Sequence, residues 1–133
     1  MVTFKSDSYS ISATASALAE FLGNPSNLKL ILPEDRIENW KEKENGCSFK
    51  IKGLAEIHLK VEDSSEEKVV FRSDSDKPFA FKLIVHFAQN DQTSTELSAN
   101  FDADVNSFMS MMLKTPLTNF LNALGEAIKK HFA

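Results

Sequence analysis

Apolar residues recur at every third or fourth position in the last quarter of the chain, from Asn106 to Ala133. This spacing predicts one long helix with a single apolar face. Asn106 or Ser107 can cap the start of the helix, and the cations at 129–131 suit its negative C-terminal end. The predicted apolar face consists of Leu113, Leu117, Phe120, Leu121, Leu124 and Ile128.

The first third of the chain predicts one strand and two shorter helices. Partial alternation of apolar and polar residues over 3–11 indicates the strand. The first helix follows Ser12 and ends at Gly23, a common helix stop. The second spans 25–32, where Pro25 suits the first turn because its missing N–H would be unpaired there anyway. The apolar stripe expected for the first helix consists of Ala13, Ala17, Leu18, Phe21 and Leu22.

From Ile37 onward the apolar period changes to two, which is typical of strands. The odd spacing of Ile37 and Trp40 predicts a bulge, and Asn45 with Gly46 predicts a two-residue type I′ hairpin turn. A loop is expected at 76–78. The positions expected to face inward are Cys47, Phe49, Ile51, Ala55, Ile57, Leu59, Val61, Val69, Phe71, Phe79, Phe81, Leu83, Val85, Phe87, Leu97, Ala99, Phe101, Ala103 and Val105. Those expected to face solvent include Ser48, Lys50, Lys52, Glu56, His58, Lys60, Glu62, Lys82, His86, Asn100, Asp102 and Asp104.

The short links between these six strands predict an antiparallel meander, because they cannot cross over to make parallel neighbours. The whole order is strand, two helices, six strands and a long helix. A curved seven-stranded antiparallel sheet wrapped around the C-terminal helix would cover every apolar face. We therefore expect an α+β, helix-grip type of architecture in one domain over residues 1–133.

Composition and charge narrow the classes of function. No apolar run is long enough to span a bilayer, and the N-terminus lacks the basic-then-apolar pattern of a secretory signal, so we expect a cytoplasmic protein. The lone Cys47 agrees with a reducing compartment. A formal charge of −4 gives no electrostatic reason to bind nucleic acid,. The cluster of Lys50, Lys52, His58 and Lys60 is interpreted as a solvated face of the sheet.

Several segments carry a likeness to a known family. They are FLGNPSNLKLILPE, NGCSFKIKG, PFAFKLIVHF and NSFMSMMLKTPLTNFLNAL. Together with the order of elements, they resemble small bacterial members of the START-like superfamily, also called SRPBCC or Bet v 1-like, of the polyketide-cyclase or dehydrase type. The resemblance covers roughly residues 3–132. It implies a hydrophobic cavity between the sheet and the last helix, but it does not settle function, since the superfamily includes lipid carriers, hormone receptors, cyclases and chaperone activators.

Eleven Phe residues, against one Trp and one Tyr, supply large apolar area without polar groups,. Flexible Met side chains near the start of the last helix suit variable apolar ligands, and Pro116 is expected to bend that helix. The alternatives are that these residues fill an ordinary core and that Pro116 separates two helices. The candidate ligand-binding residues are Trp40, Phe49, Ile51, Ile57, Leu59, Phe71, Phe79, Phe81, Leu83, Phe101, Phe108, Met109, Met112, Pro116 and Phe120.

The sequence shows no clear arrangement of side chains that suits catalysis. His58, His86 and His131 are far apart, so neither a metal site nor a Cys–His pair is expected, and no cofactor is implied. The polar residues at expected inward positions are Ser73, Thr93, Thr95, Cys47, Tyr9 and Asn39, none a convincing base. The leading hypothesis is binding of a small hydrophobic ligand, a lipid or a polyketide-like aromatic. The alternatives are a cyclase or dehydratase and a protein-interaction module; the oligomeric state stays open.

Overall fold

The computed structural model describes residues 1–77 and 79–133 and has the predicted order of elements. The expected loop at 76–78 includes Pro78, which lies outside the described residues. The N-terminal elements are β1 (Val2–Lys5), β2 (Tyr9–Ile11), α1 (Ala15–Leu22), the 3-10 turn η1 (Pro25–Asn27) and α2 (Leu28–Ile31). The others are β3 (Ile37–Lys43), β4 (Gly46–Ile51), β5 (Glu56–Ser64), β6 (Lys68–Ser73), β7 (Phe81–Gln89), β8 (Thr95–Ala103) and α3 (Ser107–His131).

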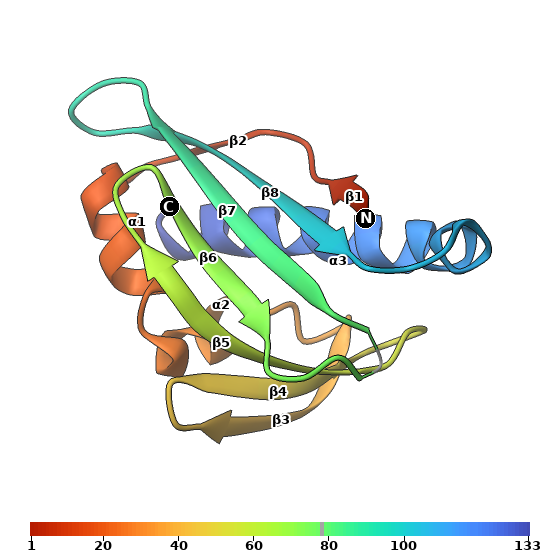
Figure 1. Cartoon of the computed structure of the whole chain (residues 1–133). Coiled ribbons are helices and arrows are strands. Elements are labelled where there is room, and N and C mark those ends of the chain that lie inside the picture. The colour runs from red at the N-terminus through yellow and green to blue at the C-terminus, as the bar shows by residue number, and fades with distance from the viewer. Residues whose placement is uncertain (78) are drawn as a thin grey trace.

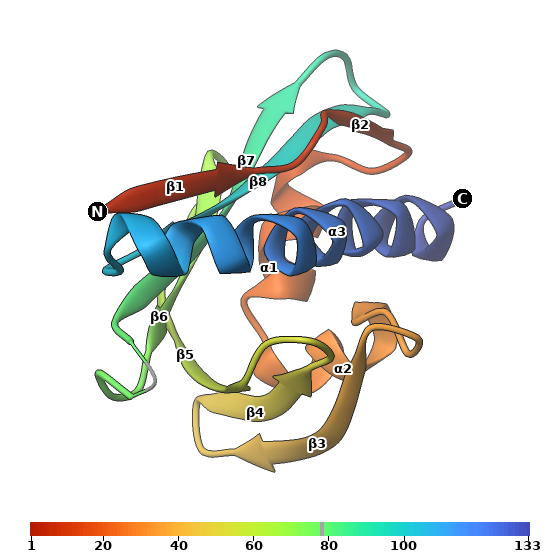
Figure 2. The same ribbon diagram turned by 90° about the vertical axis from the view of Figure 1, so that its right-hand side faces the viewer.

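The strands form one antiparallel sheet in the order β1-β8-β7-β6-β5-β4-β3, and β2 also pairs with β8. The sheet curves so that α3 lies across its concave side (Figures 1 and 2). The helix-grip prediction is confirmed, with eight strands in place of seven. The expected first strand is interrupted at Asp7, whose N–H donates to Asn122 Oδ1 on α3 at 2.8 Å.

The long helix α3 begins as the sequence predicts. Asn106 caps it, because its side chain accepts a hydrogen bond from the Met109 N–H at 2.8 Å. The predicted apolar face is buried, and α3 continues unbroken past Pro116. The alternative that Pro116 separates two helices is therefore wrong. Among the described residues, no helix combines the length and apolar content needed to cross a bilayer.

Alternation along the strands also places most side chains as expected. Strand β8 alternates between buried and half-buried residues along its whole length. Ser48 on β4 and Ala17 on α1 are among the positions that differ from the prediction. Ser48, expected on the solvent face, is fully buried, because it stands between strands β3 and β5, where Lys41 and His58 are its direct neighbours. Ala17, expected in the buried stripe of α1, is exposed, and Ala15 and Ala19 are buried instead.

The predicted hairpin between β3 and β4 forms, but its two-residue loop lies one position before the expected Asn45 and Gly46. Lys43 pairs with Gly46, so Glu44 and Asn45 make the loop. Only Asn45 takes a positive φ, of 61°, which is inconsistent with the expected type I′ turn,. Gly46 is required for another reason: a Cβ there would lie 2.1 Å from the Leu59 carbonyl oxygen. The predicted bulge near Trp40 is confirmed by a register shift between Glu38 and Lys41.

The N-terminal segment is held against α3. The Tyr9 hydroxyl donates to Asn122 Oδ1 at 2.9 Å, the same oxygen that accepts from Asp7. The Tyr9 ring lies over Gly125, where an added Cβ would come within 2.5 Å of the ring. A glycine on the buried face of α3 thus allows the strap formed by β1 and β2 to pack closely on the helix.

Candidate ligand-binding site

Three phenylalanine rings gather at the end of the sheet where α3 begins. Phe81 on β7 and Phe101 on β8 stack with their ring centroids 4.8 Å apart. Phe79 meets both rings edge-on, with centroids 6.2 Å from Phe81 and 6.3 Å from Phe101. Stacked and edge-to-face pairs at these distances are favoured by the ring quadrupoles. This end of the interior therefore presents a preorganised aromatic wall.

A second group of stacked aromatic rings extends from β3 through β4 to α3, at a later point along the helix. Trp40 stacks on Phe49 with centroids 6.4 Å apart, and Phe49 stacks on Phe120 of α3 at 5.9 Å. Trp40 is half-buried beside a surface cleft of about 220 Å³ between α2 and β3. The series thus connects the surface at β3 with the centre of the core.

The predicted site residues fall into two groups. One group lies in the buried core: Phe49, Ile51, Ile57, Leu59, Phe71, Phe79, Phe81, Leu83, Phe101 and Phe120, with Trp40 packed against it. The other group lies at the surface of α3. Phe108 is 72% exposed, Met112 64% and Met109 36%, while Pro116 is half-buried. The fold brings the first group together, and the second lies at its edge.

Among the residues that the structure describes, the hydrophobic cavity that the family resemblance implies between the sheet and α3 is not found beside the middle and last turns of the helix. Leu117, Leu121 and Ile128 on α3 are completely buried, which leaves no water-sized space beside them,. Toward the start of the helix, Leu113 is 8% and Phe79 5% exposed, which is similar to the 7% of Phe87 further along β7 and the 8% of Ala19 on α1.

The loop between β4 and β5 reaches α3 at the same end. Gly53 in this loop has a φ of +82°, and a Cβ there would lie 3.9 Å from the Cβ of Pro116. We use the name mouth for Gly53 and for the candidate residues at the surface of α3, which are Phe108, Met109, Met112 and Pro116. Sequence reasoning missed Gly53, although a glycine between two alternating segments is a signal for a turn with positive φ.

Most of the polar side chains predicted to face the interior either form hydrogen bonds with backbone groups or lie at the surface. Thr95 donates to the Ala13 carbonyl at 2.7 Å, and Ser73 accepts from the Phe81 N–H at 3.1 Å. Thr93 and Asn39 are exposed, so their expected inward positions are wrong. Ser48 and Thr95 are the fully buried residues with a polar side chain in the described part of the chain. The aromatic wall is therefore almost purely apolar.

Cys47 is buried within the core, and this burial raises the pKa of its thiol to about 12, even though nearby Lys43 acts in the opposite direction. We expect Cys47 to resist iodoacetamide at pH 8 in the folded protein and to react quickly in urea. The pKa of the Cys47 thiol is higher in the folded protein than its value of 9.0 in the unfolded chain. The stabilisation that results from this difference is therefore complete below pH 9 and is lost as the pH rises toward 12. Rapid labelling of native protein, measured by mass spectrometry, would contradict this burial.

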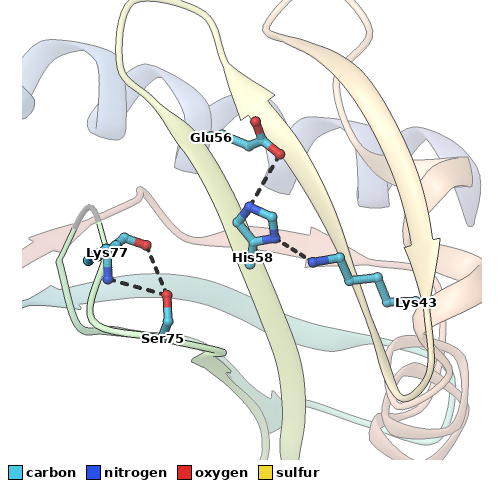
Figure 3. Close-up of polar contacts among 5 residues, drawn as sticks. All are labelled: Lys43, Glu56, His58, Ser75 and Lys77. Carbon is cyan, nitrogen blue, oxygen red and sulfur yellow. Dashed lines mark hydrogen bonds and ion pairs between the residues drawn. The ribbon is translucent and has the colours of Figure 1, made fainter.

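The three histidines lie apart from the aromatic wall. His58, on the solvent side of β5, has its Nε2 3.2 Å from Glu56 Oε1, and its Nδ1 lies beside the Lys43 amino group (Figure 3). His86 contacts Asn100, and the ring of His131 lies 4.7 Å from that of Phe21. Residues 1–77 and 79–133 contain no cluster of three side chains suited to hold a metal ion.

Two groups of polar contacts lie on the surface of the sheet. In Figure 3, Ser75 Oγ accepts from the Lys77 N–H and donates to the Lys77 carbonyl oxygen, which shapes the turn after β6. The short polar network of Lys43, Glu56 and His58 joins β3 to β5 across the face of the sheet away from α3. Both groups stabilise the surface of the sheet and lie outside the interior.

No protein-family model and no curated protein sequence matches the chain. Solved structures do match it over nearly its whole length. A START superfamily protein from Mycobacterium smegmatis aligns with 98% of this chain and 96% of its own, at 11% identity and a TM-score of 0.67. The chain has a START-like helix-grip fold.

Two further solved structures match with higher TM-scores. The KanY protein in solution aligns with 98% of this chain and 97% of its own, at 11% identity and a TM-score of 0.79. A point mutant of Thalictrum flavum norcoclaurine synthase, in complex with a transition-state analogue, covers 98% and 93% at 14% identity and a TM-score of 0.74. At these identities the START-like matches establish the fold alone.

Proposed function

We propose that this START-like protein binds a small hydrophobic ligand, a lipid or an aromatic molecule, between the sheet and α3. The observation that carries the proposal is the position of the aromatic wall, Phe79, Phe81 and Phe101, at the end of the core where α3 exposes Phe108 and Met112. Apolar side chains are present both inside this end of the core and on the adjacent surface of α3. This arrangement favours a hydrophobic ligand that moves from the surface into the core.

Binding requires a conformational change at the mouth, because the core is filled in the closed form. Flexible Met side chains repack at low cost, and Met109 and Met112 are 36% and 64% exposed on α3. Burying apolar ligand surface would contribute roughly 25 cal/mol per Å² before the costs of ordering and displacement. The complex of norcoclaurine synthase with a transition-state analogue supports the idea that this fold can hold a small molecule.

The contact between Gly53 and Pro116 provides a direct test of entry at the mouth. Their Cβ positions, 3.9 Å apart, match the separation of about 3.8 Å found in disulfides,. We expect oxidised G53C/P116C protein to take up the neutral probe N-phenyl-1-naphthylamine at least tenfold more slowly than the reduced protein. Stopped-flow fluorescence measures the rate, and dithiothreitol should restore it.

The single variants G53C and P116C are the matched controls, since neither can form this bridge and G53C carries the same backbone strain at a φ of +82°. Buried Cys47 should remain unpaired in all of them. Uptake that is equally fast before and after reduction, with the disulfide verified by mass spectrometry, would exclude entry between the loop and α3. Absence of binding by natural-chain protein to this probe and to fatty acids in native mass spectrometry would remove the proposal itself.

A further inference from the structure

Strand β1 leaves one edge of the sheet open. Among the described residues, β8 is the strand that pairs with β1, in the antiparallel register Val2 with Ala103 to Lys5 with Asn100. The Ser6 N–H donates to the Ala99 carbonyl at 2.9 Å, and hydrogen-bonded pairs alternate along an antiparallel ladder. The N–H and C=O groups of Thr3 and Lys5 therefore point away from β8, toward the open edge.

A cleft of about 510 Å³ lies between this edge and the first half of α3. Figure 2 shows β1 running alongside that half of the helix. All four residues of β1 contribute to one wall, so the strand presents its edge as well as its side chains. The other wall is one face of α3, formed by Ser110, Met111, Lys114 and Thr118. The four-residue strand is about 13 Å long, which is the length of a short extended peptide.

The side chains around the cleft are apolar and basic. Met111 is 78% exposed and supplies apolar surface to the cleft. Lys5 and Lys114 both line the cleft, and neither belongs to the ion pairs found in the described part of the chain. The cleft therefore combines unpaired backbone groups, an apolar contact and two cations.

We propose that β1 accepts an extended acidic segment of a partner protein as an additional strand. The segment would bond to the backbone of Thr3 and Lys5, place apolar side chains against Met111, and place carboxylates near Lys5 and Lys114. Addition of a strand to an open edge is an established mode of peptide recognition. The cleft shares Phe4 with the buried core, but the proposed contacts use the open backbone edge of β1 and the surface of α3, so they do not require a ligand between the sheet and α3.

Electrostatic repulsion argues against a second copy of this chain as the occupant of the cleft. Pairing of β1 with β1 of another copy would bring two sets of Lys5 and Lys114 together, and like charges at close range are unfavourable. A segment with alternating apolar and acidic residues avoids this repulsion and satisfies both walls. The chemistry of the cleft therefore favours a heterologous acidic peptide.

The test uses the capped peptide EVEVEV, and KVKVKV as its charge-reversed control, in NMR titrations of the full chain. We expect EVEVEV to bind at least tenfold more tightly than KVKVKV and to slow hydrogen exchange at the Thr3 and Lys5 amides. Thr3→Pro should weaken binding at least tenfold, because proline lacks the N–H that points to the open edge. Thr3→Val is the matched control, since it loses the hydroxyl and keeps the N–H.

A second pair of variants tests the charge. Lys114→Glu should weaken binding of EVEVEV at least fivefold, whereas Lys129→Glu, the same exchange at an exposed position near the other end of α3, should leave it unchanged. Equal binding of both peptides, or unchanged binding by the Thr3→Pro protein, would overturn the proposal. So would self-association through β1 in sedimentation experiments, or binding of phosphatidylglycerol vesicles at this cleft in place of EVEVEV.

Discussion

Replacing Phe120 with alanine should lower the free energy of unfolding by about 3 to 5 kcal/mol. Phe120 is 1% exposed and stacks on Phe49, so its removal leaves a cavity in the middle of the interface between α3 and β4. The whole folding free energy of a domain of this size is about 5 to 15 kcal/mol. Urea denaturation followed by circular dichroism measures the loss.

Phe108 is the matched control for this substitution. It is the same residue type in the same helix, but it is 72% exposed. Phe108→Ala should change the free energy of unfolding by less than about 0.5 kcal/mol. Similar losses in the two variants would mean that Phe120 does not lie in the core as described.

Replacing Gly46 with alanine should cost about 3 kcal/mol of folding stability. The new Cβ would lie 2.1 Å from the Leu59 carbonyl oxygen and 3.2 Å from the Lys60 Cα. These are backbone atoms of β5, so no side-chain rotation relieves the clash, and the paired strands must separate. Thermal unfolding compared with that of the natural chain measures the effect.

Asn45→Gly provides the comparison at the neighbouring position. Asn45 already has a positive φ of 61°, a conformation that glycine adopts without strain,. This variant should stay within about 0.5 kcal/mol of the natural chain. A neutral Gly46→Ala variant would show that β4 and β5 do not approach as closely as the register of Gly46 with Lys60 requires.

The fold could be predicted from the sequence because its elements have strong local signals. The period of α3 identifies its buried face, and the Asn106 cap identifies its start. Alternation identifies the inward residues of β7 and β8 in the same way. These signals depend on the periods of regular structure, which each segment carries by itself.

The exceptions depend on neighbours that are distant in the sequence. Ser48 is buried because two flanking strands enclose it. Gly46 is needed because β5 approaches its backbone. Strand 3–11 divides because Asn122, more than a hundred residues away, binds the Asp7 N–H. No local pattern contains this information.

The candidate site was predictable only in part. Phe79, Phe81 and Phe101 could be assigned to one inward face, and the fold does bring their rings together. The sequence could not tell an aromatic wall that lines a cavity from one that is packed against its neighbours, since both require the same residue types. Nor could it place Gly53 against Pro116, because that contact forms between separate elements.

The attachment of the N-terminal strap to α3 has a consequence for how the chain is made. Tyr9 and Asp7 bind Asn122, across 113 and 115 positions of sequence, and β1 and β2 pair with β8. During synthesis on a ribosome, the first strands emerge long before these partners exist. The concave side of the sheet also stays uncovered until α3 has left the exit tunnel. Completion of the native core therefore requires α3 to have left the exit tunnel. Until then, the exposed Phe-rich strands stay soluble only if aggregation is slow or if chaperones bind them.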